Sequence, residues 1–427
     1  MEAGTRERGT DLAGGRAAAL NYYSHAEGLV ISVVTPAPST PLTVEVPADG
    51  PDSPVRRDYL SAAASRLIID VHGLPSRWDT SFHAGRLRQA LALPPSVNAA
   101  KRSGPVLQRK LRSSSYRYGL DYLERLGDVL FPAVVRSAIE DCDVLCIVSH
   151  GPLHAIPFAA LPWNGHQRLG QRFGLTHVPS ASLVPLLRER TSRLDPGGRP
   201  RKVFTAAVAA AEDLDPEDFE QDNRLLAALT AGLGGTCHEL VGASGPKAVT
   251  KSAVRQGAAD HDLVHFACHG VFLDSSGDAM QTSGLLLSAN GVPPQLSMLA
   301  GDDDRLTGEA GEHLLTAEEV LAMDLNADLV TLRACSSGRS AVLAGDELMG
   351  LTRAFMFAGT ASMLASLWNV NKLSSRLLLT EFYRRWLPTD GESKWQALQG
   401  AQDVVRQTDG YEHPFHWAAF ALLGNWR

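Results

Sequence analysis

From about Asp143 onward, short unbroken apolar runs alternate with amphipathic stretches of helical period. Runs such as VLCIV, LVHFAC and LVTLRA lack the apolar–polar alternation of a strand with one wet face, so they suit strands covered on both faces. A chain in which strands and helices alternate in this way folds as an α/β unit with right-handed crossovers. The pattern therefore predicts an α/β protein with a mostly parallel β-sheet and helices on both of its faces.

The segment before Asp143 has a different composition and a different periodicity. Residues 1–26 are rich in Gly, Arg and Ala without periodicity, which predicts a loosely ordered tail. Two β-branched runs, Leu29 to Val34 and Leu42 to Val46, flank the turn-forming stretch PAPSTP and predict a hairpin. Helical patterns follow at about 56–71, 83–92 and 117–139, and Pro132 is expected to kink the last of them.

The composition limits the partners and the compartment. A net charge of −7 gives no general attraction to a phosphate backbone, so the sequence predicts no nucleic-acid partner. No run approaches the roughly 18 apolar residues of a membrane-spanning helix, and the first residues lack the apolar core of a secretory signal. The five cysteines form no CxxC pair and are expected to be reduced thiols. We therefore expect a cytoplasmic protein without membrane insertion.

Two apolar runs are followed directly by residues that could take part in catalysis. LVHFAC is followed by His269 and Gly270, and LVTLRA is followed by Cys335. Ligands of an open parallel sheet bind at the carboxyl ends of its strands, and strands that follow each other in sequence usually lie side by side. The sequence therefore predicts that an imidazole and a thiol meet at one sheet edge. A buried structural role for each residue is the plainer alternative, and it is the one expected for Cys268.

A thiol beside an imidazole suits nucleophilic catalysis. The imidazole of His269 would take the thiol proton and later protonate the leaving amine, while the thiolate of Cys335 attacks a carbonyl carbon. The helix that follows the cysteine would favour the thiolate through its dipole. The main-chain N–H groups of Gly270 and Cys335 would stabilise the oxyanion. This is the arrangement of a cysteine hydrolase.

The order of several blocks resembles a known family. HFACHG, LLTAEEVLAMDL, LVTLRACSSG, GDELMGLTRAFMFAGTASMLASLWNV and HPFHWAAFALLGN look like the CHAT domain, a caspase-like family related to separases. The upstream stretch VLCIVSHGPLHAIPFAALP fits the same pattern. The resemblance implies a caspase-like cysteine endopeptidase in which His269 is the general base and Cys335 the nucleophile. The family has a catalytic dyad, so the resemblance requires no third carboxylate. We expect neither a cofactor nor a metal.

The resemblance also sets the expected domain boundaries. It covers residues 115–427, divided into a first part at 115–200 and a catalytic core at 200–427. A smaller N-terminal module of hairpin and helices is expected at 27–114, after the tail. We find no repeat of 33–45 residues that would indicate a helical repeat array.

Arg333 bears on specificity. It lies two residues before Cys335 on the same predicted strand, so both side chains are expected on one face. In caspase-like folds this position reaches the pocket for P1, the substrate residue before the cut, and an arginine there would favour an acidic P1. Asp346 and Glu347 could instead neutralise Arg333, select a basic P1, or only stabilise a helix N-terminus.

The stretch SLWNVN follows the next predicted strand. By the resemblance, Trp368 and Asn369 would line the substrate groove, although Trp368 could simply pack against the core. The polar segment 288–313, which contains GDDDR, is too long and too rich in Gly and Pro for a regular element. It is interpreted as a gating or self-cleavage segment.

Other functions fit less well. His261, His265 and His269 have the spacing of metal ligands on a helix, but they occupy a predicted strand. Neither a phosphate-binding GxxxxGK[ST] motif nor a GxSxG motif occurs. The main alternative is a catalytically silent caspase-like docking module. The resemblance further implies a specific protein substrate, such as a gasdermin in bacterial antiviral defence and programmed cell death, and an activating partner protein.

Overall fold

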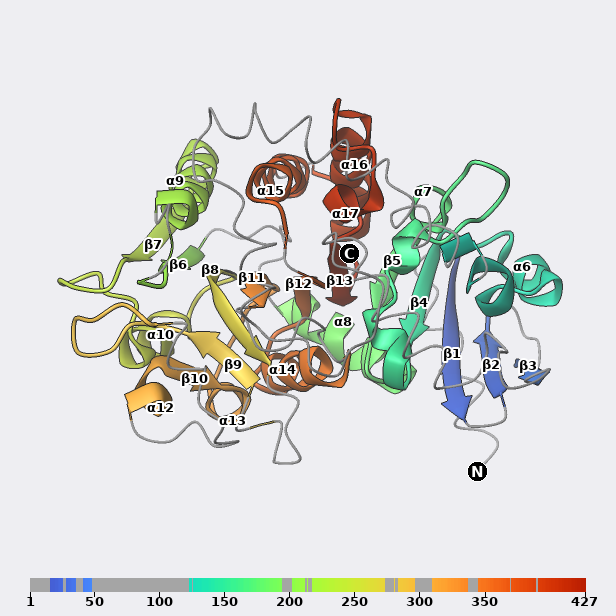
Figure 1. Cartoon of the computed structure of the whole chain (residues 1–427), viewed down its shortest axis with the longest axis horizontal. Coiled ribbons are helices and arrows are strands. Elements are labelled where there is room, and N and C mark those ends of the chain that lie inside the picture. The colour runs from blue at the N-terminus through green and yellow to red at the C-terminus, as the bar shows by residue number, and fades with distance from the viewer. Residues whose placement is uncertain are drawn as a thin grey trace, which may run out of the picture.

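The computed structural model describes residues 16–25, 28–35, 41–47, 123–124, 126–193, 202–211, 213, 217–272, 280, 283–295, 309–336, 345–368, 370–388 and 391–427. A 13-stranded sheet with helices on both faces forms its centre (Figure 1). This architecture confirms the predicted α/β class.

The strands are β1 (Ala17–His25), β2 (Gly28–Val34), β3 (Leu42–Pro47), β4 (Val144–Val148), β5 (Gly174–His177), β6 (Lys202–Ala207), β7 (Thr236–Val241), β8 (Leu263–Phe272), β9 (Ser283–Leu286), β10 (Leu314–Thr316), β11 (Leu329–Ser336), β12 (Ser362–Ser366) and β13 (Phe420–Gly424). The helices are α6 (Ala133–Ile139), α7 (Leu169–Arg172), α8 (Val184–Arg193), α9 (Glu217–Gly232), α10 (Lys251–Gly257), α12 (Glu309–His313), α13 (Ala317–Leu321), α14 (Gly345–Phe357), α15 (Lys372–Trp386), α16 (Lys394–Gln407) and α17 (Pro414–Trp417). Short 3-10 turns lie at Gly151–Ala155, Phe158–Ala160 and Ala181–Leu183.

The strand order is β10-β9-β8-β11-β12-β13-β5-β4-β1-β2-β3, with β6 also paired to β8 and β7 paired to β6. Seven of the pairs between described strands are parallel and five are antiparallel, as predicted for a mostly parallel sheet. The central strands β8 and β11 are buried on both faces, as their unbroken apolar sequences require.

The N-terminal hairpin belongs to the same sheet. β2 and β3 pair in antiparallel fashion where the sequence predicts a hairpin. β1 joins them to the rest of the sheet because it pairs antiparallel with β2 and parallel with β4. The structure differs here from the predicted loosely ordered tail, since Ala17–His25 is a strand. Its run of three alanines carries no strand signal, but small side chains pack closely in a buried site.

The helical pattern predicted for 117–139 is divided at Pro132. This residue precedes α6 with extended backbone angles, φ −61° and ψ 159°. A proline has no N–H to donate to a preceding turn, so it starts a new helix more easily than it continues one. The other two predicted helices, at 56–71 and 83–92, lie outside the described residues.

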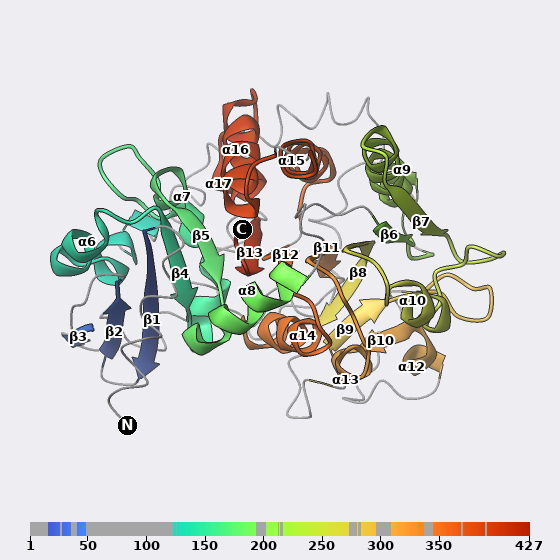
Figure 2. The ribbon, with the colours of Figure 1, turned by 180° about the vertical axis from the view of Figure 1, so that it is seen from behind.

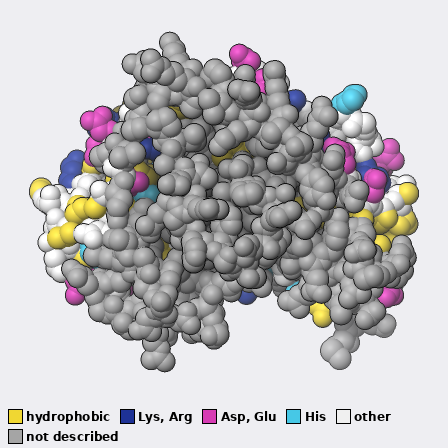
Figure 3. Space-filling model, in the orientation of Figure 1, with side chains coloured by type: hydrophobic (Ala, Val, Ile, Leu, Met, Phe, Trp, Pro, Cys, Tyr) yellow, Lys and Arg dark blue, Asp and Glu magenta, His cyan; other side chains and the backbone are white. Residues whose placement is uncertain are grey.

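Helices cover both faces of the sheet. α9, α15 and α16 lie on one side, and α13 and α14 lie on the other, as the front and rear views show (Figures 1 and 2). On the face shown in Figure 3, described acidic and basic side chains lie near one another at both ends of the long axis. No described helix is both long and apolar enough to span a bilayer.

Candidate active site

The parallel pairing of β8 and β11 brings the predicted base and nucleophile together. The two strands are in register from Leu263 opposite Leu329 to Gly270 opposite Ser336. In this register Cys335 lies directly opposite His269. Both residues lie within three residues of the carboxyl ends of their strands, where open parallel sheets bind ligands. The predicted meeting of these two positions at one sheet edge is therefore present in the backbone.

A carboxylate holds the imidazole of His269. Nε2 of His269 lies 2.7 Å from Oδ2 of Asp213. Asp213 follows β6, which pairs with β8 only as far as Ala207 opposite Ala267. Beyond that point the chain turns, with the N–H of Asp213 donating to the carbonyl of Ala210 and the N–H of Ala210 donating to Oδ2 of Asp213. The turn places the carboxylate above the end of β6, beside the histidine.

The other ring nitrogen of His269 is available for chemistry. Nδ1 is buried and has no hydrogen-bond partner in the described part of the chain. His269 is only 8% exposed, and its ring packs against Phe219 of α9 at 5.3 Å between ring centroids. A carboxylate on one nitrogen fixes the orientation of an imidazole and leaves the second nitrogen to exchange protons. The geometry thus gives His269 the form of a positioned general base.

Asp213 is held in its charged form. Burial raises the pKa of this carboxyl group, but the hydrogen bond and charge of His269, the N–H of Ala210 and the charge of Lys372 outweigh it. The pKa of Asp213 is therefore below its usual value. An ionised carboxylate at this place stabilises the positive charge that His269 acquires when it accepts a proton.

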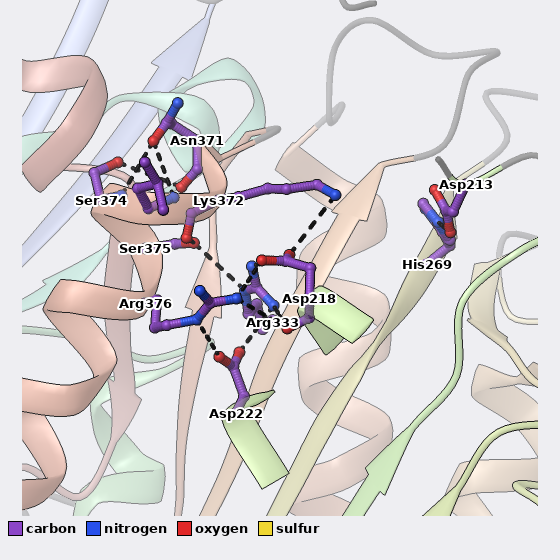
Figure 4. A network of polar contacts seen from close by, with 11 residues as sticks. Asp213, Asp218, Asp222, His269, Arg333, Asn371, Lys372, Ser374, Ser375 and Arg376 are labelled. Carbon is purple, nitrogen blue, oxygen red and sulfur yellow. Dashed lines mark hydrogen bonds and ion pairs between the residues drawn. The ribbon is translucent and has the colours of Figure 1, made fainter. Parts of the chain in front are cut away.

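Arg333 lies beneath this edge in a buried ionic network (Figure 4). It is 3% exposed, and its guanidinium group lies 2.7 Å from Asp218 and 2.9 Å from Asp222, both on α9. Arg376 of α15 also contacts both carboxylates, and Nε of Arg333 donates to Ser375 of the same helix at 3.4 Å. Arg333 thus joins β11 to two helices, and its charge is compensated inside the protein.

Burial shifts the pKa of a carboxyl group in this network. It raises the pKa of Asp222, with Asp218 adding to the rise and the two arginines offsetting part of it. Deeper in the same layer, Tyr383 donates to Thr331 at 2.8 Å and its hydroxyl lies 2.9 Å from Nδ1 of His265. Burial, assisted by Arg333, lowers the pKa of His265 to about 3. His265 is therefore neutral at ordinary pH and belongs to the scaffold.

The remaining predicted site residues occupy varied positions. Gly270 is a buried strand residue paired with Ser336 and with Leu285 of β9. Trp368 is 4% exposed and its indole N–H donates to the carbonyl of Phe415, which fits the packing alternative.

The other predicted site residues lie in α14 and in the stretch after Trp368. Asp346 and Glu347 occupy the first turn of α14, as a role at a helix N-terminus requires. Asn369 lies outside the described residues. So do residues 296–308, which form most of the predicted gating segment.

In the described ranges, no group of three or more His, Cys, Asp or Glu residues is placed so that it could hold one metal ion. His265 and His269 lie on a β-strand, as predicted, and each has a different partner. Cys268 is buried, in agreement with the core role expected for it.

The fold and the paired strand ends define a caspase-like α/β protein. Residues 120–425 match the family model of the CHAT domain. Because this match covers well over half of the chain, the protein belongs to the CHAT domain family.

Relatives and solved structures agree with this assignment. Tetratricopeptide repeat protein 28 from Homo sapiens is 31% identical over 306 residues, and the protein of that name from Mus musculus is 28% identical over 312. Each match covers 66% of this chain but only 12% of the relative. Two structures of the Saccharomyces cerevisiae separase–securin complex superpose with TM-scores of 0.53 and 0.52. They cover 98% of this chain and 30% and 31% of theirs, at 10% and 11% identity, so the likeness concerns the fold.

The structure adds site residues that the sequence did not indicate. Asp213 comes six residues after the last residue of β6, at the same kind of strand end as His269. That position was a usable signal, because residues after each apolar run are the ones expected to contact ligands. Asp218 and Asp222 gave no such signal, since acidic residues in the first turns of an amphipathic helix usually face water.

Proposed function

We propose that this chain is a cysteine endopeptidase that cuts a specific protein. Cys335 is the nucleophile, His269 the general base and Asp213 the residue that orients the base. The observation that carries the proposal is the paired register of Cys335 and His269, in which one imidazole nitrogen is held by a carboxylate and the other has no partner among the described residues. A positioned base beside a thiol is the basic requirement of nucleophilic cysteine catalysis.

The reaction follows from these roles. Nδ1 of His269 takes the proton of the Cys335 thiol, and the thiolate adds to the scissile carbonyl carbon. The main-chain N–H groups of Gly270 and Cys335 stabilise the oxyanion that forms. The protonated imidazole then gives its proton to the leaving amine, and the acyl-enzyme remains. A water molecule, deprotonated by the same imidazole, attacks the thioester and releases the acid and the free thiol.

A protein substrate fits the comparisons. The separase structures contain a bound protein, securin, and their fold is the one seen here. By analogy we propose that the target is a protein in the cytoplasm. More specifically, we propose a gasdermin-like substrate and a partner protein that activates the peptidase. The similarity to tetratricopeptide repeat protein 28 favours the alternative of a docking module, because repeat proteins commonly act through binding.

Turnover of a P1-diversified fluorogenic peptide library tests the proposal. Cleavage by the wild type is expected to disappear in Cys335→Ala and in His269→Ala. Cys237→Ala on the edge strand β7 and His166→Ala at an exposed site are matched controls that should keep full activity. Activity that survives Cys335→Ala would refute the assigned nucleophile. A wild type that cuts neither peptides nor candidate partner proteins would support the docking alternative.

A further inference from the structure

In the network around Arg333, one of the described cations makes only a long ion-pair contact. Two carboxylates, Asp218 and Asp222, face three cations, Arg333, Arg376 and Lys372. The two arginines form the short contacts. Nζ of Lys372 lies 4.0 Å from Asp218, at the outer limit of an ion pair, and makes no hydrogen bond within the described residues. Lys372 is also the most exposed of the three, with 48% of its side chain accessible.

The topology places Lys372 at the catalytic edge of the sheet. β12 is the parallel neighbour of β11, and it ends at Ser366 on the edge where Cys335 lies. The chain then enters α15, whose first residue is Lys372. Asn371 caps this helix, and the first turn contains no acidic residue. A 15-residue helix that begins here directs the positive end of its dipole to the same edge.

Electrostatics connect Lys372 to the proposed base. Its charge contributes to the lowered pKa of Asp213, the partner of His269. Figure 4 shows the Lys372 side chain crossing above Asp218 toward the side where Asp213 and His269 lie. At that side Nδ1 of the buried His269 has no partner among the described residues, and it is the nitrogen that exchanges the proton in the proposed mechanism.

We infer that Lys372, at the N-terminus of α15, binds an acidic side chain of the protein substrate and gives the peptidase a preference for Asp or Glu at P1. This inference rests on the proposed function and adds the class of substrate to it. Arg333 has the supporting role of compensating the buried carboxylates of α9. Because Asp218 and Asp222 are already paired with arginines, they leave no free negative charge to select a basic P1.

Peptides that differ only at P1 provide the first test. The wild type is expected to cut after Asp about tenfold or more faster in kcat/KM than after Asn, the size of a charge-assisted contact at a partly exposed site. Lys372→Gln should bring this ratio close to one, and Lys372→Glu should shift the preference toward Lys and Arg. Lys202→Gln, at the amino end of β6 and therefore at the opposite edge, is the matched control and should keep the wild-type ratio.

Binding to a variant without the nucleophile separates this inference from the proposed function. P1-varied peptides are titrated against Cys335→Ala and against Cys335→Ala with Lys372→Gln, with fluorescence polarisation as the readout. Acid-selective binding that depends on Lys372 supports the inference even if the wild type cuts nothing, in which case only the peptidase proposal fails. Cleavage that requires Cys335 but ignores Lys372, or binding without an acid preference, overturns the inference.

Discussion

Asp213→Asn isolates the contribution of the carboxylate that holds His269. The substitution keeps the size of the side chain and removes its charge from a 2.7 Å contact with Nε2. The side chains of His269 and Asp213 are 10% and 17% exposed, so solvent screens the contact only weakly. Hydrogen bonds to charged groups contribute about 1.5–3 kcal/mol. We therefore expect kcat to fall about 10- to 100-fold, since each 1.36 kcal/mol changes a rate about tenfold.

The kinetic pattern distinguishes positioning from substrate binding. Asp213 contacts the base and not the substrate, so KM should change little while kcat falls. The rate at which iodoacetamide alkylates Cys335 should fall as well, because a less stabilised imidazolium leaves less thiolate. Asp260→Asn, an exposed site in the turn before β8, serves as the matched control and should affect neither quantity.

The stability of the same variant should depend on pH in a defined direction. The folded-state pKa of Asp213 is below its usual value, so its charge stabilises the folded state at neutral pH. This contribution is complete above the unfolded pKa of about 3.9 and is lost as pH falls through the lower folded value. The wild type should therefore exceed Asp213→Asn in free energy of unfolding from pH 6 to 8, and the difference should shrink below about pH 4.

Unchanged kcat and an alkylation rate equal to the wild type would refute the role of Asp213 as orienting residue.

The buried polar groups predict three further effects on the free energy of unfolding, each measured by urea denaturation. Arg333→Met removes the most buried of the cations that contact the two carboxylates of α9 and should cost about 3–5 kcal/mol. Tyr383→Phe removes the hydroxyl that contacts Nδ1 of His265 and should cost about 1–3 kcal/mol. Lys394→Met breaks a fully buried pair with Asp328 at 2.8 Å and should cost about 3–5 kcal/mol; a loss under 1 kcal/mol would contradict the assigned contact.

The parts of the site that the sequence predicted are those that depend on strand periodicity. The runs LVHFAC and LVTLRA are unbroken because β8 and β11 are covered on both faces, and their first residues are the first residues of the two strands. The carboxyl end of β11 lies two residues beyond its run and that of β8 four residues beyond, at Phe272. Successive strands of this type tend to be neighbours, and this rule placed His269 beside Cys335. The topology rule predicted only that the two residues lie side by side, and the register that sets Cys335 opposite His269 comes from the structure.

The site residues that the sequence did not predict are placed by contacts between segments that are distant in the sequence. Asp213 reaches His269 because β6 ends before the level of the histidine, and strand length cannot be read to this accuracy from sequence. Asp218 is buried against Arg333 and Arg376, 115 and 158 positions away, which supply the compensating charge. In the sequence, an acidic residue in the first turn of a helix that pairs with an arginine of a strand cannot be distinguished from one that faces water.

The ionic layer beneath the proposed site links stability to specificity. Burying two carboxylates and a guanidinium group costs free energy that ion pairing offsets only in part, so hydrophobic side chains could stabilise this layer at least as well. The charges do something that hydrophobic packing does not, because they fix α9 and α15 against β11 at particular atoms. α15 carries Lys372 at its first residue, and α9 carries Phe219, which packs on the ring of His269. The directional contacts in this layer therefore fix the position of Lys372 relative to His269. With uncharged side chains in their place, the distance between Lys372 and His269 would be less strictly defined.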